Sequence, residues 1–455
     1  MKSKLAIYLS VLAMVFAFSS CANDDGDEAS SPYAYIKSFS IGDVKSSYPA
    51  FTATGKDTVI VKTISGSSYP FVINQASGEI YNSDSLPYAT NLSKLVIGMT
   101  LEGVAMIYVE ESGVYESFSL EDSLDFTTPR EFRVTSLDGS YSKFYTISVN
   151  AHQVEPDLLT WKKVSKAVSP SPEKAIEFGD RIYVFGRLST GDPVVTSAQY
   201  GENVVWSMSK TVESLPSTVD FSTMHLFNGT LYVLADGDLY TSADAENWTV
   251  ALQGYGLLAI IGASEAEDCL WFASADNIYR REGAGELSVF SALPDDFPLY
   301  GVSTMSYALS HNKSIMRYVL VGYTTKEKDG SPKVWSMLST EDTWEKYDNT
   351  GNQYSCPALE RLAVLRYDDE LYAFGGKGTA EGKEVEAFSS FYVSRDNGIT
   401  WKAQTDFYQT LPKELKGLNI PFTAFIDSDN YMWIITSDDN VGVYRGIINR
   451  LGFKK

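Results

Sequence analysis

The sequence contains very little histidine or cysteine, and it lacks the short motifs that mark common catalytic and metal sites. Only three histidines and three cysteines occur among 455 residues. There is no HExxH, no CxxC and no glycine-rich phosphate loop. His152, His225 and His311 are too few for a galactose-oxidase-like copper site, and on a predicted inner strand His225 fits a hydrogen-bonded core residue. We therefore predict no metal and no cofactor.

Positive charge is also scarce. Lysine and arginine total 37 against 58 aspartates and glutamates, which gives a net charge of -21 and a pI of about 4.6. Such a surface repels polyanions, so we predict no nucleic-acid partner. A sialidase-like mechanism needs an arginine cluster, and the arginines form no recognisable set. With so many carboxylates, a pair at glycosidase spacing arises by chance and does not by itself indicate an enzyme.

Long apolar runs are absent, and the first twenty residues hold the one run that matters for targeting. Lys2 and Lys4 precede residues 5–18, an apolar run with the length of a signal-peptide core rather than a membrane span. The sequence Phe18-Ser-Ser-Cys21 resembles a bacterial lipoprotein cleavage site. Residues 1–20 are therefore predicted to be a lipoprotein signal peptide, with the lipid on Cys21. An ordinary secretory signal is the alternative.

The next segment, residues 21–32, is acidic at its start and is predicted to be a flexible tether. Acidic residues directly behind such a cysteine resemble the export signals of surface lipoproteins in Bacteroidetes-type bacteria. We expect an outer-membrane lipoprotein exposed at the cell surface and held to the membrane by its lipid. Cys269, in a predicted strand, is interpreted as a buried small side chain, and one disulfide between Cys269 and Cys356 is the alternative.

Aromatic residues are abundant, at 13% of the chain, and this favours pleated, half-buried strands. Residues 33–152 contain short strand-like runs without a convincing helix. In 132–149 two alternating runs flank Asp138-Gly139, which predicts a β-hairpin. This hairpin resembles those that end bacterial immunoglobulin-like modules, so 33–152 is predicted to be an Ig-like β-sandwich that spaces a second domain from the membrane. Pro156 marks the boundary.

One pattern recurs six times in residues 157–455: a polar turn followed by an apolar run with an aromatic residue. The spacing averages about 50 residues, close to that of kelch-type propeller blades. These repeats predict a six-bladed β-propeller in which helices are nearly absent. Residues 158–164 resemble an outer strand, and pairing them with the last repeat would close the ring. The six runs are 179–186, 228–234, 267–272, 316–322, 368–376 and 429–435.

The stretch Ser394-Arg-Asp-Asn-Gly-Ile-Thr-Trp401 matches the Asp-box of sialidase-like and related propellers, and 242–248 is a weaker copy. Asp396 can accept backbone hydrogen bonds, Gly398 permits a positive φ, and Trp401 can pack between sheets. We interpret the motif as a turn between the two outer strands of a blade. In the folds that it resembles, this turn lies away from the active-site face, so we do not assign it a catalytic role.

Long loops on a rigid ring are where function tends to lie. Three links between second and third strands look long, namely 187–200, 323–333 and 377–386, and they would share a face with the links between blades. Tyrosine rings and cationic side chains on that face could hold a sugar or an acidic glycan. The candidate binding residues are Arg187, Tyr200, Tyr300, Tyr323, Tyr354 and Lys377.

Together, the lipoprotein signal, the immunoglobulin-like module and the kelch-like and Asp-box-like repeats resemble a family of uncharacterised surface lipoproteins from Bacteroidetes-type bacteria. That resemblance transfers no activity. We expect a non-enzymatic surface protein that binds glycan or protein through the long-loop face. The alternatives are a glycoside hydrolase or lyase acting at the same face, and a scaffold within an outer-membrane protein complex.

Overall fold

The computed structural model describes residues 31–453, without 52–56, 202–203, 329, 348–350 and 406. The predicted signal peptide, Cys21 and most of the predicted tether lie outside the described residues. Within them there is no α-helix, which confirms the prediction of an all-β chain, and no helix is long and apolar enough to cross a membrane. The chain divides into two compact units between Pro156 and Asp157. Short 3₁₀ helices are η1 (Gly66–Ser68), η2 (Lys413–Leu415) and η3 (Asn449–Gly452).

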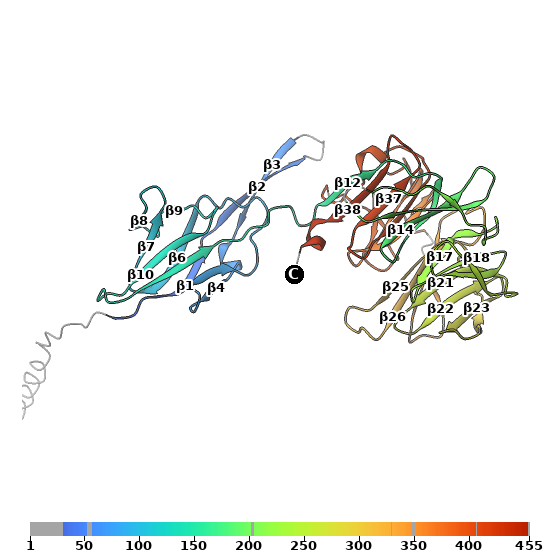
Figure 1. The fold of residues 1–455 in the computed structure, drawn as a ribbon, viewed down its shortest axis with the longest axis horizontal. Coiled ribbons are helices and arrows are strands. Elements are labelled where there is room, and N and C mark those ends of the chain that lie inside the picture. The colour runs from blue at the N-terminus through green and yellow to red at the C-terminus, as the bar shows by residue number, and fades with distance from the viewer. Residues whose placement is uncertain are drawn as a thin grey trace, which may run out of the picture. The chain divides into compact units, whose positions relative to one another are not determined.

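The first unit packs a three-stranded sheet, β1-β6-β9, and a six-stranded sheet, β4-β5-β11-β10-β7-β8, around one core (Figure 1). Strands β2 and β3 pair separately. Pairing of β10 with β11 confirms the hairpin predicted around Asp138-Gly139. The strands are β1 (Tyr35–Ile41), β2 (Val44–Phe51), β3 (Asp57–Ile64), β4 (Phe71–Asn74), β5 (Glu79–Asn82), β6 (Leu95–Glu102), β7 (Val104–Val109), β8 (Val114–Glu116), β9 (Ser123–Leu124), β10 (Arg130–Thr135) and β11 (Ser142–Ser148).

The core of the first unit follows from strict alternation along its strands, since successive side chains of a strand point to opposite faces. In β10, Phe132 and Val134 are fully buried, whereas Glu131, on the opposite face of the strand, is exposed. Tyr145 of β11 is also buried, and its hydroxyl accepts a hydrogen bond from the Ile36 N–H of the opposite sheet at 3.2 Å. This bond ties the two sheets together across the core.

The second unit contains six four-stranded antiparallel sheets within its described residues. All six runs identified in the sequence are second strands of these sheets, which confirms the repeat assignment. The sheets are β13 (Ser171–Phe178), β14 (Arg181–Arg187), β15 (Pro193–Gln199) and β16 (Lys210–Thr211); β17 (Asp220–Phe227), β18 (Thr230–Ala235), β19 (Asp238–Ser242) and β20 (Thr249–Leu252); β21 (Leu257–Ser264), β22 (Cys269–Ser274), β23 (Asn277–Glu282) and β24 (Ser288–Ala292); β25 (Tyr300–Ala308), β26 (Met316–Tyr323), β27 (Lys333–Leu338) and β28 (Glu345–Lys346); β30 (Ala363–Tyr367), β31 (Glu370–Phe374), β34 (Tyr392–Ser394) and β35 (Lys402–Ala403); and β36 (Phe422–Ile426), β37 (Met432–Thr436), β38 (Val443–Ile448) and β12 (Leu159–Ser165).

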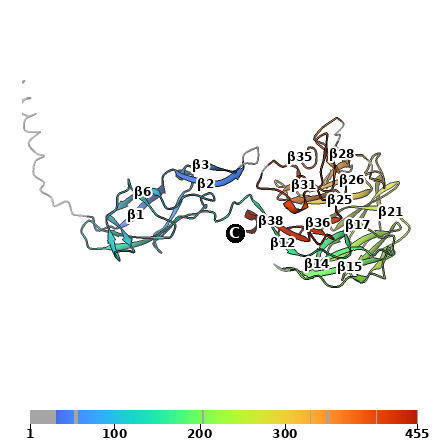
Figure 2. The same ribbon diagram turned by 90° about the horizontal axis from the view of Figure 1, so that it is seen from above.

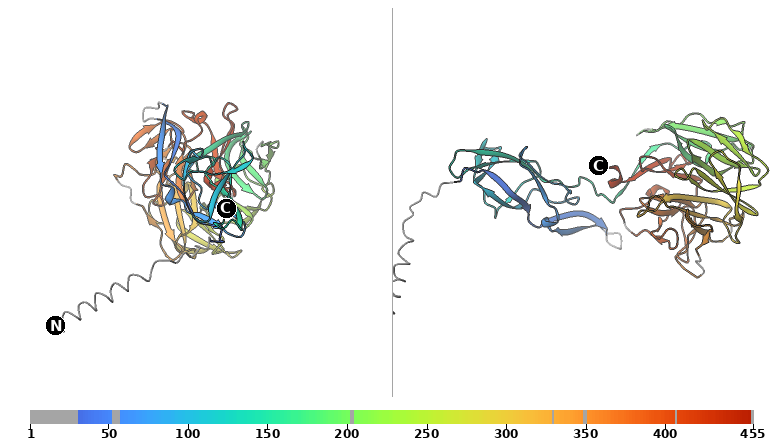
Figure 3. Two further views of the ribbon diagram at one scale, coloured as in Figure 1. Left: turned by 90° about the vertical axis from the view of Figure 1, so that its left-hand side faces the viewer. Right: turned by 90° about the horizontal axis from the view of Figure 1, so that it is seen from below.

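These sheets form a closed ring. Their first strands contact one another in the order β13, β17, β21, β25, β30, β36 and back to β13. Figure 2 shows β17, β25 and β36 toward the middle of this unit and β15, β28 and β35 at its periphery. In the left panel of Figure 3 the chain passes around the unit from green through yellow and orange to red. Each first strand therefore faces a common centre.

Closure of the ring joins the two ends of the unit. Strand β12 pairs with β38 from Leu159↔Ile448 to Ser165↔Val443, which confirms the pairing predicted for 158–164. Leu159 and Val164 are buried on the two sides of this sheet. Strand β38 therefore lies inside its sheet, between β12 and β37, and is not an open sheet edge.

Two departures from the sequence expectations concern loops and cysteines. The predicted loop 377–386 forms a hairpin, β32 (Gly378–Ala380) and β33 (Lys383–Val385), which pairs with β29 (Ala358–Leu359). Cys269 and Cys356 are free thiols buried in different clusters, so the disulfide alternative is not realised.

Candidate binding site in the central channel

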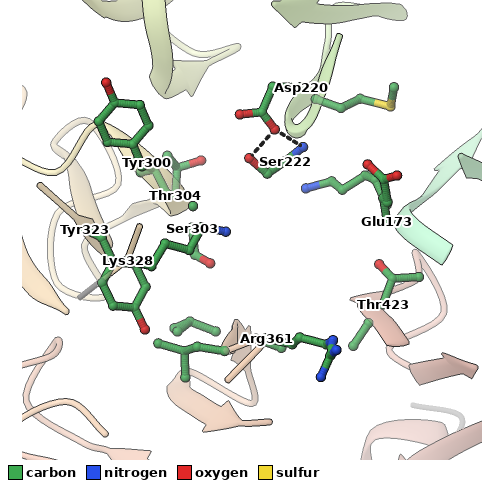
Figure 4. A pocket seen from close by; sticks show the side chains of 18 of the residues that line it. Glu173, Asp220, Ser222, Tyr300, Ser303, Thr304, Tyr323, Lys328, Arg361 and Thr423 are labelled. Atoms are coloured by element: carbon green, nitrogen blue, oxygen red, sulfur yellow. Dashed lines mark hydrogen bonds between the residues drawn. The ribbon is translucent and has the colours of Figure 1, made fainter. Parts of the chain in front are cut away.

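A channel of about 2130 Å³ occupies the centre of the ring. The free edges of the first strands and the segments that lead into them form its wall. Figure 4 shows polar side chains around it, which come from strands of several sheets and from the links beside them. These include Glu173, Asp220, Tyr300, Lys328, Arg361 and Thr423.

The mouth of the channel lies on the edge where second strands turn into third strands and the chain passes between sheets. Asp236 and Gly237, which connect β18 to β19, line it, as do Tyr323 and Lys328 at the β26–β27 link. Thr218, in the link before β17, lines it too. This is the edge that the sequence pattern indicated as the long-loop face.

Irregular pairing of the first strands helps to direct polar side chains inward. The register shifts between Pro172 and Lys174 in β13, and again between Tyr300 and Ser303 in β25. A bulge turns a side chain away from the alternation of a regular strand and is common beside binding sites. Because of these shifts, the wall carries hydroxyl and charged groups as well as apolar ones.

Three of the predicted site residues meet at this channel. Tyr300, Tyr323 and Lys377 all line it, on the side of the sheets that contain β25 and β30. Tyr323 is only 6% exposed, and burial raises the pKa of its hydroxyl to about 12. Lys328 lies against the backbone of Gly301, where an added Cβ would be 2.9 Å from Lys328 Cε. The long β26–β27 link therefore folds back over the start of β25.

Arg187 does not line the channel, but it contacts residues that form the channel wall. Its guanidinium pairs with Glu173, donates to the Val219 carbonyl and lies 5.2 Å from the centre of the Phe221 ring. These contacts join the first sheet to the second. Arg187 therefore fixes the position of Glu173 in the wall rather than facing the channel itself.

Tyr200 and Tyr354 lie outside the channel. The predicted loop 187–200 contains β15, so Tyr200 follows a third strand at the opposite edge, where burial and Glu177 raise the pKa of its hydroxyl. The Tyr354 ring is 5.1 Å from Lys402 Nζ on the outer strand β35. Only a short loop separates β14 from β15, and β15 lacks the strong alternation by which a strand is recognised in a sequence. The sequence pattern therefore predicts a single long loop that ends at Tyr200.

His225 joins the first strands β17 and β25, which are not successive in the ring but approach each other directly beside the channel. Its Nε2 is 2.5 Å from Thr304 Oγ1 of β25, and its Nδ1 is 2.9 Å from the Thr223 carbonyl. Because a carbonyl can only accept, Nδ1 carries the proton and Nε2 accepts from the threonine hydroxyl. Burial, reinforced by Lys174, lowers the pKa of His225 to about 4. A neutral histidine with a hydrogen bond at each ring nitrogen agrees with the core role expected from the sequence.

Lys174 is one of several channel residues, with Glu173, Asp220, Arg361 and Thr423, that the sequence pattern does not reveal. It lies in β13 and lines the channel wall, and burial lowers the pKa of its ammonium although Asp220 opposes that shift. In the sequence it is one lysine in an unremarkable run, Ser171-Pro-Glu-Lys174. Only the register shift before it marks the position, and that shift is not visible without the structure.

The turn 394–401 has the hydrogen bonds predicted for it and lies outside the channel lining. Asp396 accepts from the Thr400 N–H at 2.8 Å and from its hydroxyl at 2.6 Å. Gly398 has a φ of 101°, and its carbonyl accepts from Trp401 Nε1 at 2.9 Å. Burial would raise the pKa of Asp396, but the bonds from Thr400 and Ser394 outweigh it and the pKa is lowered. The side chains of Ser394, Asp396 and Thr400 are used within the turn, whereas Arg395 pairs with Glu370 and Asn397 accepts a hydrogen bond from the Tyr307 hydroxyl.

The weaker copy repeats this geometry. Asp244 accepts from the Glu246 and Asn247 N–H groups at 3.0 and 2.7 Å, and Ala245 has a positive φ of 65°. Trp248 Nε1 donates to the Ala245 carbonyl at 3.3 Å. Among the residues that the structure describes, no group of three or more His, Cys, Asp or Glu side chains is placed to bind a metal.

A closed ring of four-stranded sheets around a channel defines the second unit as a β-propeller. The chain belongs to the DUF6242 family. The model of the family's β-propeller domain matches residues 155–455, and that of its N-terminal domain, a domain of unknown function, matches residues 39–149.

Solved structures with some similarity were also found, whereas no curated protein matches the chain. The iodide structure of Trichoderma reesei Carbohydrate-Active Enzymes Family AA12 is similar over 64% of this chain and 96% of its own, with 9% sequence identity and a TM-score of 0.38. The β-propeller domain of the Trilobed protease from Pyrococcus furiosus is similar over 69% of this chain and 86% of its own, with 9% identity and a TM-score of 0.32.

Proposed function

We propose that this protein is a non-enzymatic binding protein of the bacterial cell surface, and that its ligand enters the channel of a six-bladed propeller. The observation that carries the proposal is the channel itself. Its volume of about 2130 Å³ exceeds the roughly 300–1,000 Å³ of ordinary small-molecule pockets. An oligomeric ligand, such as a glycan chain end or a protein loop, suits such a space better than a metabolite.

The chemistry of the wall favours a glycan as that ligand. Ser222, Ser303 and Thr423 offer hydroxyl groups, and Tyr300 offers a ring beside the mouth. Saccharides present alternating hydroxyl groups and apolar ring faces, which match such a mixed wall. The six sheets and the Asp-box-like turns support the six-bladed propeller. For the first unit, two sheets around one core support the immunoglobulin-like spacer.

The membrane attachment rests on the sequence alone. We propose that the mature chain is an outer-membrane lipoprotein of a Bacteroidetes-type bacterium, anchored through a lipid on Cys21 and displayed outward. Mass spectrometry of the mature amino terminus tests this proposal. A diacylglyceryl-modified Cys21 is the expected result, and an unmodified Cys21 or an uncleaved Met1 would contradict it.

The second candidate function is a glycoside hydrolase, because such enzymes use a pair of carboxyl groups and the channel wall contains carboxylates. Glu173 and Asp220 come from neighbouring sheets and both border the channel (Figure 4). Each is already engaged, Glu173 by Arg187 and Asp220 by the N–H and hydroxyl of Ser222 at 2.9 and 2.6 Å. A hydrolase needs one carboxyl group free to donate a proton to the leaving oxygen. The observed pairing therefore argues against Glu173 and Asp220 as that acid, while Asp236, Glu327, Glu360 and Glu384 also line the channel and leave the turnover assay to decide.

A glycan-array screen of the whole chain, followed by a turnover assay on every hit, tests the function. We expect binding without released sugar, and product formation would replace binding by the hydrolase or lyase alternative. Tyr300→Ala should weaken binding about tenfold or more. Tyr354→Ala is the matched control, since Tyr354 lies outside the channel. Absence of any hit, together with co-purification of membrane proteins, would favour the scaffold alternative.

A further inference from the structure

Lys174 is placed in the channel by the fold of β13 rather than by a regular strand. Pro172 pairs with Gly186, whereas Lys174 pairs with the next residue back, Phe185, so the strand carries an extra residue at this point. Ala175 beyond it is fixed by a 3.0 Å bond from its N–H to Thr423 Oγ1 of β36. The backbone on both sides of Lys174 is thus held, and its side chain lines the channel.

The ammonium group of Lys174 has no hydrogen-bond or ion-pair partner in the described part of the chain. Asp220 acts on it electrostatically without forming a salt bridge, and Asp220 is bonded to Ser222. His225, on the same strand as Asp220, is neutral at physiological pH. The neighbouring first strand β36 contributes no titratable side chain. Asp220 is therefore the one opposite charge that acts on Lys174 from the strands packed against β13, and it forms no ion pair with the ammonium.

The other charged groups of the channel differ from Lys174 in being engaged or at the rim. Glu173 pairs with Arg187. Arg366 pairs with Asp369, and Lys377 is 3.7 Å from Glu360. Lys174 is half-buried in the channel wall, and a partly desolvated cation without an ion-pair partner favours an anionic ligand that supplies the opposite charge. Burial lowers the pKa of Lys174, which is the expected sign of this desolvation.

We infer that Lys174 anchors an anionic group, a carboxylate or a sulfate, on a saccharide that enters the channel. This inference rests on the proposed glycan-binding function and specifies its ligand as acidic. A single ammonium deep in a polar channel accepts either oxyanion, because lysine acts as a point charge with three rotatable donors. Hydroxyl groups nearby, such as those of Ser303 and Thr423, would then hold the neutral part of the sugar.

Matched charged and neutral saccharides test this inference by isothermal titration calorimetry on the whole chain. One pair is oligogalacturonate and its methyl ester, and the other is dextran sulfate and dextran. We expect at least one charged member to bind ten times more tightly than its neutral counterpart. The pair that shows this difference identifies the anion. Equal affinity within both pairs would overturn the inference while leaving glycan binding intact.

Three variants assign the effect to the residue. Lys174→Met should lose the preference for the charged saccharide, and Lys174→Arg should keep most of it. Lys416→Met, an exposed lysine outside the channel lining, is the control and should bind as the wild type does. Because Lys174 has no partner to lose, Lys174→Met should melt at the same temperature as the wild type or higher. Unchanged binding by this folded variant would overturn the inference.

Inorganic sulfate provides a test that does not depend on finding a saccharide. At low millimolar concentration, against chloride of equal ionic strength, sulfate should raise the melting temperature of the wild type more than that of Lys174→Met. If no saccharide binds but this difference appears, the glycan function fails and the anion site stands. If the two proteins respond equally, the anion site fails.

Discussion

At the scale of single residues, the channel depends on polar groups that the fold places without exposing them fully. His225 is the clearest case, since both of its ring nitrogens are hydrogen-bonded and its neutral form joins β17 to β25 beside the channel. Protonation would place a positive charge in a desolvated position near Lys174 and would reverse the hydrogen bond that Nε2 accepts from Thr304. The fold therefore opposes protonation of this histidine, and that opposition is measurable as a dependence of stability on pH.

We expect the free energy of unfolding to fall by about 2 kcal/mol through His225 alone when the pH drops from 7.5 to 5.0. The pKa of His225 is about 4 in the folded chain and about 6.5 in the unfolded chain. Between these values the unfolded chain binds more protons, so acid favours unfolding. Urea denaturation of His225→Gln at both pH values should show a smaller loss than the wild type.

His311→Gln is the control for that measurement, because His311 is exposed and should leave the pH dependence of the wild type unchanged. The same dependence in His225→Gln would contradict the prediction. All eight tryptophans lie between residues 161 and 433, so tryptophan fluorescence reports unfolding of the propeller without a contribution from the first unit.

At the scale of elements, turns between outer strands hold neighbouring sheets together. The turn 394–401 uses its aspartate and serine to bond its own backbone, and this leaves Trp401 free to pack against the adjacent sheet. Gly398 is required there for two reasons. Its φ is 101°, and a Cβ would lie 2.9 Å from Val334 Cγ1 of β27.

Gly398→Ala should therefore destabilise the propeller by about 2–4 kcal/mol, the sum of backbone strain and overpacking. Gly382→Ala is the matched comparison. Gly382 also has a positive φ, of 70°, but an added Cβ would meet nothing within 4 Å, so about 1–2 kcal/mol is expected. Equal losses in the two variants, measured by urea denaturation, would show that contact with Val334 contributes nothing.

At the scale of the whole molecule, closure of the ring by β12 decides whether the propeller is one cooperative unit. Strand β12 covers the edge of β38, and it buries Leu159 and Val164 in the two adjoining cores. Without it, β38 would present unpaired backbone groups at an open edge. Strand β12 lies immediately after the boundary at Pro156. Truncated chains that begin just before or just after β12 would therefore form a closed or an open ring.

A chain that begins at Asp157 should fold and unfold with the tryptophan transition of the full protein. A chain that begins at Lys166 lacks β12 and should lose about 4 kcal/mol or more, since burial of a Leu or Val side chain contributes roughly 1.5–3 kcal/mol. Denaturation followed by fluorescence, with size-exclusion chromatography for association through the open edge, checks both chains. Equal midpoints would mean that closure adds no stability.

The sequence by itself determined the strands, the turns and the closing pair. Alternation of apolar residues, the turn residues of 394–401 and the outer-strand pattern of 158–164 are local properties, and local physics decides them. The rule that long links and blade-to-blade links share one edge of a ring led to Tyr300, Tyr323 and Lys377, which line the channel, and their role in binding stays a prediction. The same rule led to Arg187, Tyr200 and Tyr354, which do not line it. For Tyr200 the reason is that strand β15 occupies the assumed loop.

Only the tertiary structure decided which charges meet and which remain without a partner. The one-residue register shift before Lys174 comes from the pairing of β13 with β14, and no local pattern encodes it. The bond between His225 and Thr304 joins residues of two sheets that are not successive in the ring. Ring closure brings such residues together, and pairing between distant strands sets their directions. The chemistry of the channel is therefore a property of the assembled sheets.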